Sequence, residues 1–186
     1  MSKGYSGHFN GTLGTTYGNS KLKEKSYSDR GIEIPKELKT TLSKLKKKGD
    51  YIAINGKRFS MKDVSIMSKE TGVEFAKVKV DGKSYIIRGD RNGTTIPKIL
   101  LDKMKSGSGK LAFHSHPHNG DLVPSSADKA VMKTLRKTTG QRVSTIVTPD
   151  GRTCTFNEHG VVSTGTVSNK IDKSLREAYI KMFGGK

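Results

Sequence analysis

The amino-acid sequence predicts one domain of the mixed α/β (α+β) class, in which helices pack on a mixed β-sheet. After residue 50, segments with helical spacing of apolar residues alternate with short strands and hairpins. The chain has 186 residues, which is long enough for a hydrophobic core. Only 32% of its residues are hydrophobic, so we expect a modest core and a large solvated surface.

Charge and cysteine content indicate which kinds of partner and which kinds of site this protein can have. The net charge of +18 favours polyanionic partners such as nucleic acid or acidic proteins, although a basic surface without a dedicated partner is an equal alternative. Cys154 is the only cysteine, which excludes an internal disulfide and cysteine-rich zinc sites. The sequence contains neither a long apolar run nor a secretory signal, so we expect no membrane span and a cytoplasmic location. Export by a non-classical or effector route stays open.

Three segments are expected along the chain. Residues 1–34 form a polar arm rich in glycine and serine, without helical or strand periodicity, and we expect it to be flexible. Residues 35–59 contain a basic helix and a short hairpin that turns at Asn55-Gly56. Residues 60–186 form the main domain.

Helices are predicted where apolar residues recur at helical spacing. Ser60 and Asp63 have the spacing of an N-terminal cap, and Gly72 follows as a helix-ending residue. Ser125 or Ser126 is expected to cap the helix that follows the histidines. The helical ranges are 35–48, 60–68, 96–105, 125–139 and a last helix that begins at Ser168 or Asn169. The apolar or inward residues of the two central helices are expected to be Ile99, Leu100, Met104, Ala130, Val131, Thr134 and Leu135.

Strands are predicted where apolar residues alternate between turn signals. Asp-Gly at 81–82 turns the first hairpin of the main domain, and Pro-Asp-Gly at 149–151 turns the last one. In the first of these strands, Glu74 lies on the same face as the alternating alanine and valines. The strand ranges are 74–80, 84–89, 110–116, 142–148 and 152–156.

The strand over 110–116 carries two histidines at its C-terminal end. Residues two apart on a strand point to the same side, so His114 and His116 are directed together. A catalytic zinc typically takes three protein ligands and leaves one position for water, whose pKa it lowers. Asp128, in the first turn of the next helix, is the natural third ligand because the intervening loop can fold it back toward the strand. We therefore predict a Zn²⁺ site formed by His114, His116 and Asp128.

Other interpretations of these residues are weaker. Two loop histidines and a capping aspartate would be the simplest alternative, but His-x-His-Pro followed by Ser-x-x-Asp is a more specific pattern. His118 and Asp121 lie in the same loop and are alternative ligands, although exposed loop positions are the simpler interpretation for both. A nucleobase deaminase would need Pro-Cys-x-x-Cys, which one cysteine cannot supply.

The stretch from His114 to Asp128 resembles the signature of the JAB/MPN (JAMM) metalloprotease family, which is a distant glutamate, then His-x-His-Pro, then Ser-x-x-Asp. The resemblance covers roughly residues 60–165 and implies a three-layer α-β-α fold related to that of the zinc deaminases. It implies zinc held by the two histidines and the aspartate, a glutamate as general acid/base, and Ser125 as stabiliser of the oxyanion. The loop from the second histidine to Ser125 is one residue longer than usual, which makes Ser126 a neighbouring candidate.

Glu74 is the best candidate for the catalytic glutamate. A glutamate on the apolar face of a strand costs free energy unless it has a partner or a task. Glu74 shares its face with Ala76 and Val78. Glu70, four residues earlier, is expected at a helix end and facing solvent.

The resemblance implies a zinc metalloprotease that hydrolyses a peptide or isopeptide bond in a protein substrate, acidic or carrying a ubiquitin-like conjugate. The alternative is a nucleic-acid-associated or non-catalytic module on the same fold, of the RadC type, which the +18 charge supports. The N-terminal arm is also similar to segments that precede bacterial toxin or effector modules, with a disordered tail as an equal alternative.

Overall fold

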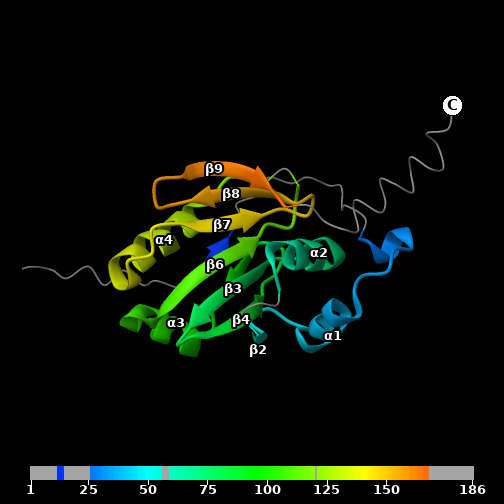
Figure 1. Ribbon diagram of the computed structural model, residues 1–186, viewed down its shortest axis with the longest axis horizontal. Helices are drawn as coiled ribbons and strands as arrows, with labels where there is room; N and C mark the ends of the chain where they lie inside the picture. The colour runs from blue at the N-terminus through cyan, green and yellow to red at the C-terminus, as the bar shows by residue number, and fades with distance from the viewer. Residues whose placement is uncertain (1–11, 15–25, 56–58, 120, 168–186) are drawn as a thin grey trace, which may run out of the picture.

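The computed structural model describes residues 12–14, 26–55, 59–119 and 121–167. A seven-stranded sheet with the order β2-β4-β3-β6-β7-β8-β9 forms its centre, and β1 and β5 form a separate two-stranded sheet (Figure 1). Neighbouring strands of the large sheet are antiparallel except β6 and β7, which are parallel. The strands are β1 (Thr12–Gly14), β2 (Tyr51–Ile54), β3 (Phe75–Val80), β4 (Lys83–Arg88), β5 (Gly93–Thr95), β6 (Gly109–Ser115), β7 (Ser144–Val147), β8 (Arg152–Phe156) and β9 (Val161–Thr166). The prediction of a mixed sheet with packed helices is confirmed.

Helices cover both faces of the large sheet (Figure 1). The helical elements are η1 (Ser28–Arg30), α1 (Lys36–Lys44), α2 (Met61–Thr71), α3 (Lys98–Lys103), η2 (Met104–Ser108, one turn of π-helix) and α4 (Ser126–Thr139). Side chains of α3, η2 and α4 share one hydrophobic core with Val78 of β3 and Ile146 of β7. Side chains of α1 and α2 share a second core with Phe75 and Phe113 on the opposite face. Among the described helices, none is long and apolar enough to span a bilayer.

The predicted caps of α2 are confirmed. The Ser60 hydroxyl accepts a hydrogen bond from the Asp63 amide, and the Asp63 carboxylate accepts one from the Ser60 amide at 2.7 Å. This reciprocal capping box satisfies amides that a helix start would otherwise leave without partners. Gly72 ends the helix with φ of +68°, a left-handed conformation that suits glycine. The helix runs to Thr71, three residues beyond the predicted end at Ser68.

The hairpin predicted at Asn55-Gly56 stays a prediction, because its turn and half of its return strand fall on residues 56–58. β2 pairs antiparallel with β4, with Tyr51 opposite Ile87, and Ser60 caps α2 where the return strand was expected. The β4 pairing places Ile52 and Ile54 of β2 against the α1/α2 core. Residues 56–58 lie outside the described part of the chain.

The buried sides of two helices can be compared with their apolar residues. In α3, Leu100 and Leu101 are buried and Ile99 is 59% exposed, while Val131 and Leu135 of α4 are buried as predicted. In α4, Ala130 is exposed and Met132 is buried against the sheet. The helical segment predicted for 96–105 ends within the predicted stop at 106–109, because η2 continues to Ser108. Apolar spacing alone does not fix the direction of a short helix, since contact with the sheet selects the buried side.

Parts of the N-terminal segment, which was predicted to be a flexible arm, belong to the folded domain. Strand β1, which was not predicted, pairs antiparallel with β5. Tyr27 is fully buried and Ile34 is 3% exposed, so both belong to the α1/α2 core. These single apolar residues carry no periodicity, which is why the sequence pattern did not indicate them. Strand β9 was also not predicted, and the helix expected from Ser168 or Asn169 lies outside the described residues.

Candidate metal centre

The sheet and the start of α4 bring the three predicted ligands together. His114 is the second-last residue of β6 and lies between two neighbouring strands, opposite Ala76 of β3 and Ile146 of β7. The His116 amide donates to the Val147 carbonyl at 3.0 Å, which fixes the chain just beyond the strand. Both imidazoles therefore rest on a backbone that is hydrogen-bonded to its neighbours.

Asp128 is positioned by the capping box of α4. Ser125 precedes the helix, and its amide and hydroxyl both donate to Asp128 Oδ2, at 2.7 and 2.8 Å. The Asp128 amide in turn donates to the Ser125 hydroxyl at 3.1 Å. These contacts occupy Oδ2 of the carboxylate and hold Oδ1 in a fixed direction.

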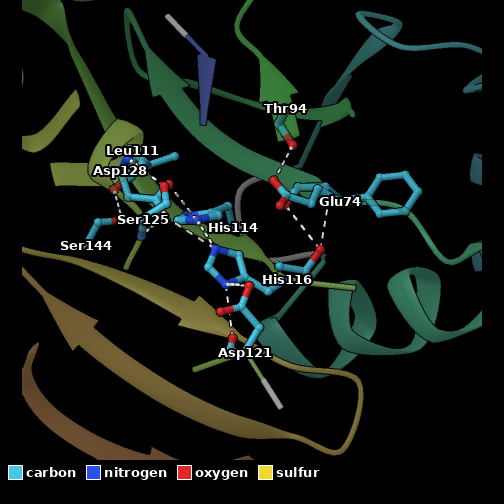
Figure 2. A network of polar contacts seen from close by, with 11 residues as sticks. Glu74, Thr94, Leu111, His114, His116, Asp121, Ser125, Asp128 and Ser144 are labelled. Atoms are coloured by element: carbon cyan, nitrogen blue, oxygen red, sulfur yellow. Dashed lines mark hydrogen bonds and ion pairs between the residues drawn. The ribbon is translucent and has the colours of Figure 1, made fainter. Parts of the chain in front are cut away.

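The ligand atoms of the three side chains converge in a buried space (Figure 2). The distance between His114 Nε2 and His116 Nε2 is 3.1 Å. Asp128 Oδ1 lies 3.1 Å from His114 Nε2, and Asp128 Oδ2 lies 3.5 Å from His116 Nε2. All three side chains are fully buried. The predicted set of His114, His116 and Asp128 thus lies together in space.

These separations fit one metal ion. Ligands at about 2.0–2.1 Å from a tetrahedral zinc lie roughly 3.3 Å from one another. His114 Nε2 lies 3.1 Å from both His116 Nε2 and Asp128 Oδ1, in agreement with that value, and one ligand atom from each of the three side chains lies within 4.8 Å of the others. Asp128 Oδ1 is also buried without a hydrogen-bond partner among the described residues, a costly state for a carboxylate oxygen unless a cation satisfies it. Two neutral imidazoles and a carboxylate are donors that zinc accepts.

Asp121 supports His116 from the outer side. His116 Nδ1 lies 2.9 Å from the Asp121 carboxylate and 3.0 Å from the Asp121 carbonyl oxygen (Figure 2). A carbonyl oxygen can only accept, so the second contact places the ring proton on Nδ1 and leaves the Nε2 lone pair directed at the centre. Asp121 was considered as an alternative ligand, but its contacts place it behind a ligand.

The electrostatics of the site favour the metal-binding protonation states. Burial lowers the pKa of His116, which keeps the ring neutral. Burial alone would raise the pKa of Asp128, but the neighbouring His114 and His116 outweigh it and hold that pKa below its usual range. Burial, reinforced by the charge of Asp128, raises the pKa of Asp121 to about 7.

Glu74 lies beside the ligand set. It is fully buried immediately before β3, and its amide donates to the Asp90 carbonyl at 3.0 Å. The antiparallel register that pairs Ala76 with His114 places Glu74 across from His116, on the same face of the sheet. The Glu74 carboxylate is outside the group whose ligand atoms lie within 4.8 Å of one another. Glu74 is therefore an acidic residue near the site that is not one of the three converging ligands.

Two neighbours of Glu74 were missed by sequence reasoning. The Thr94 hydroxyl of β5 lies 3.5 Å from Glu74 Oε2 (Figure 2). The Ser115 hydroxyl accepts a hydrogen bond from the Phe75 amide at 2.9 Å, which ties β3 to β6 beside the site. Neither residue carries a sequence signal, because both contacts depend on strand pairings between distant segments.

The remaining candidates are outside the group of three converging ligand side chains. Ser126 is the exposed first residue of α4. Glu70, predicted to face solvent, accepts hydrogen bonds from the amide and hydroxyl of Ser28. His118 lines a small pocket of about 240 Å³ with Lys69 and Arg91.

Comparisons of the chain with protein-family models, with curated proteins and with solved structures found no match. The functional inference therefore depends on the residues of the site and on their geometry.

Proposed function

We propose that this chain is a zinc-dependent hydrolase of peptide or isopeptide bonds with a JAB/MPN-type three-layer architecture. The observation that carries the proposal is the convergence of buried ligand atoms from His114, His116 and Asp128, in which His114 Nε2 lies 3.1 Å from both His116 Nε2 and Asp128 Oδ1. The order of the ligands along the chain, His-x-His-Pro and then Ser-x-x-Asp, matches the JAB/MPN signature. The helices on both faces of the mixed sheet are compatible with that fold.

Each residue receives a distinct task in this proposal. A zinc ion held by the three ligands would act as a Lewis acid and lower the pKa of a bound water. Glu74 accepts a proton on its carboxylate and returns it to the leaving amine, as a general acid/base on the same face of the sheet. The Asp121 carbonyl accepts a hydrogen bond from His116 Nδ1. Ser125 positions Asp128, and its role toward the oxyanion stays a prediction.

The surroundings of the site favour an acidic protein substrate. The 240 Å³ pocket is lined by Pro117, which follows His116, and by Val73, which precedes Glu74. Lys69, Arg91 and His118 supply its basic side chains, and none of its lining residues is acidic. A pocket of this size, below the roughly 300–1,000 Å³ typical of ligand sites, suits one substrate side chain. A carboxylate there would meet complementary charge.

The test combines metal analysis with hydrolysis. The wild type should bind about one zinc per chain and cleave peptide or lysine-linked isopeptide substrates, since one zinc occupies one such site. Glu74→Gln should keep the zinc and lose about 10²- to 10⁴-fold in kcat, because only proton transfer is removed. Glu70→Gln is the matched control, and it should cleave as the wild type does.

Two results would overturn the proposal. A wild type that takes up no zinc after loading would remove the metal site. Equal cleavage by Glu74→Gln and the wild type would remove the assigned acid/base and with it the proposed mechanism.

A further inference from the structure

A second polar region lies at the opposite end of β6 from the histidines. Lys79 of β3 and Lys110 of β6 are directly opposite each other in the antiparallel register, and both are exposed. Directly paired residues project from the same face of a sheet, so the two ammonium groups are neighbours. Like charges in this arrangement destabilise a sheet unless an anion compensates them.

These lysines line a groove of about 670 Å³, together with Arg142 and residues of the loop after α4. No lining residue is acidic. The nearest carboxylate along the chain, Asp81, is paired with Lys103 at 3.0 Å. Within the described part of the chain, Lys79, Lys110 and Arg142 have no ion-pair partner. The groove therefore presents three uncompensated positive charges.

The groove is open because α2 covers only part of its sheet face. The buried side chains of α2 share a core with Phe75, Phe113 and Val147. Figure 1 shows α2 beside the C-terminal end of β6. Lys79 and Lys110 lie on the same face at the uncovered half. The sheet itself thus forms the floor of the groove.

One wall of the groove is held in place by Gln141. Its side-chain amide donates to the carbonyls of Leu111 and Val143, both at 2.7 Å, and its side-chain oxygen accepts from the Leu111 amide at 2.9 Å. The register of β3 and β6 shifts next to Leu111, so that Ala112 of β6 has no residue of β3 opposite it. The loop that carries Arg142 is therefore fixed against β6 by specific hydrogen bonds.

We infer that this groove binds the phosphate backbone of duplex DNA. Three cations on a fixed floor and wall suit a chain of phosphates, and the net charge of +18 would favour the encounter. No lining residue is aromatic, so the groove offers no surface on which unpaired bases could stack. Duplex is therefore favoured over single strand, and binding is independent of sequence. The inference does not depend on the proposed hydrolase activity, since the groove lies on the other face of the sheet from Glu74.

The test measures binding of a dye-labelled 20-base-pair duplex of mixed sequence, by fluorescence anisotropy, over a range of salt concentrations. The full-length wild type should bind, with an affinity that falls steeply as salt rises. The double variant Lys79→Gln/Lys110→Gln should bind at least about tenfold more weakly at low salt, and its salt slope should be smaller by about 2. Thermal unfolding of each variant verifies that it is folded.

The matched control removes the same charge elsewhere. Lys44→Gln/Lys47→Gln changes two exposed lysines at the end of α1 and should leave the salt slope unchanged. Equal losses in the two double variants would mean that only net charge matters, and the inference would fail. It would also fail if the wild type bound no duplex, bound single strands more tightly, or preferred polyglutamate of equal charge.

Discussion

The two ends of β6 place opposite kinds of chemistry on one strand. At its C-terminal end, His114 and His116 are fully buried and each has a specific neighbour within 3.5 Å. At its N-terminal end, Lys110 faces solvent beside Lys79 without a compensating charge in the described residues. Buried groups interact strongly and individually, whereas exposed charges are screened and act by their number. Single substitutions should therefore have large effects at one end and small effects at the other.

The largest effect is expected from removal of one ligand. His114→Ala should lower zinc affinity by more than about 100-fold, because loss of a ligand should exceed the 10- to 100-fold cost of losing an outer contact. Competition with a chelating dye measures the affinity. The matched control is His159→Ala, whose side chain is 79% exposed and outside the site. Equal zinc affinity in both variants would contradict the assigned ligand set.

A smaller effect is expected at the pocket beside the site. Two peptides are compared: one with an acidic residue and one with glutamine in its place. Arg91→Glu should lower the ratio of kcat/KM for the acidic peptide to kcat/KM for the glutamine peptide by about fivefold. The reason is that one charge-assisted contact becomes a repulsion. Arg142→Glu, in the groove at the other end of the sheet, is the control with the same change in net charge. If the ratio fell equally in the two variants, long-range charge would explain it and the pocket would not.

The raised pKa of Asp121 predicts a pH dependence of the metal-free protein. Its folded pKa of about 7 lies above the ordinary value of 3.8, so stability present at low pH is lost as the pH rises through 7. Asp121→Asn cannot ionise, so its stability relative to wild type should increase from pH 5 to pH 8. We expect a gain of about 1 kcal/mol after allowing for solvent screening.

Urea unfolding in the presence of a chelator measures this difference. Asp102→Asn, which changes an exposed carboxylate on α3, serves as the control and should show no such increase. A difference between Asp121→Asn and wild type that stays constant with pH would show that Asp121 is ionised in the folded protein at pH 5.

The smallest effect concerns the paired lysines. Lys110→Thr should raise the free energy of unfolding by about 0.5 kcal/mol without DNA, because it relieves like-charge repulsion and places a β-branched residue on the strand. The gain should shrink in high salt, which screens the repulsion. Chemical unfolding at two salt concentrations measures it, and a loss of stability in Lys110→Thr would contradict the proposed repulsion.

The three proposed ligands could be predicted because their positions follow from local sequence. Two histidines one residue apart on a strand must share a side, and Asp128 is fixed three residues after its capping serine. The same local rules located α2 and the β3–β4 hairpin. In each case the interacting residues are close in the chain.

The features that sequence reasoning missed depend on distant contacts. The pairing of β2 with β4, the burial of Tyr27 and the contact between Thr94 and Glu74 each join segments that no local pattern connects. The contact between Asp121 and His116 depends on how the loop folds, which left Asp121 open as a ligand or a surface residue. Strand edges and loops therefore limited the prediction more than the helices did.

The two oxygens of Asp128 couple formation of the first turn of α4 to metal binding. Oδ2 belongs to the first turn of α4 through Ser125, while Oδ1 faces His114. During synthesis the histidines emerge before the aspartate, and the set of donors is complete only after that first turn closes. A metal bound there would resist fraying of α4, so hydrogen exchange of its first turn should slow when the protein matures from the apo to the loaded form.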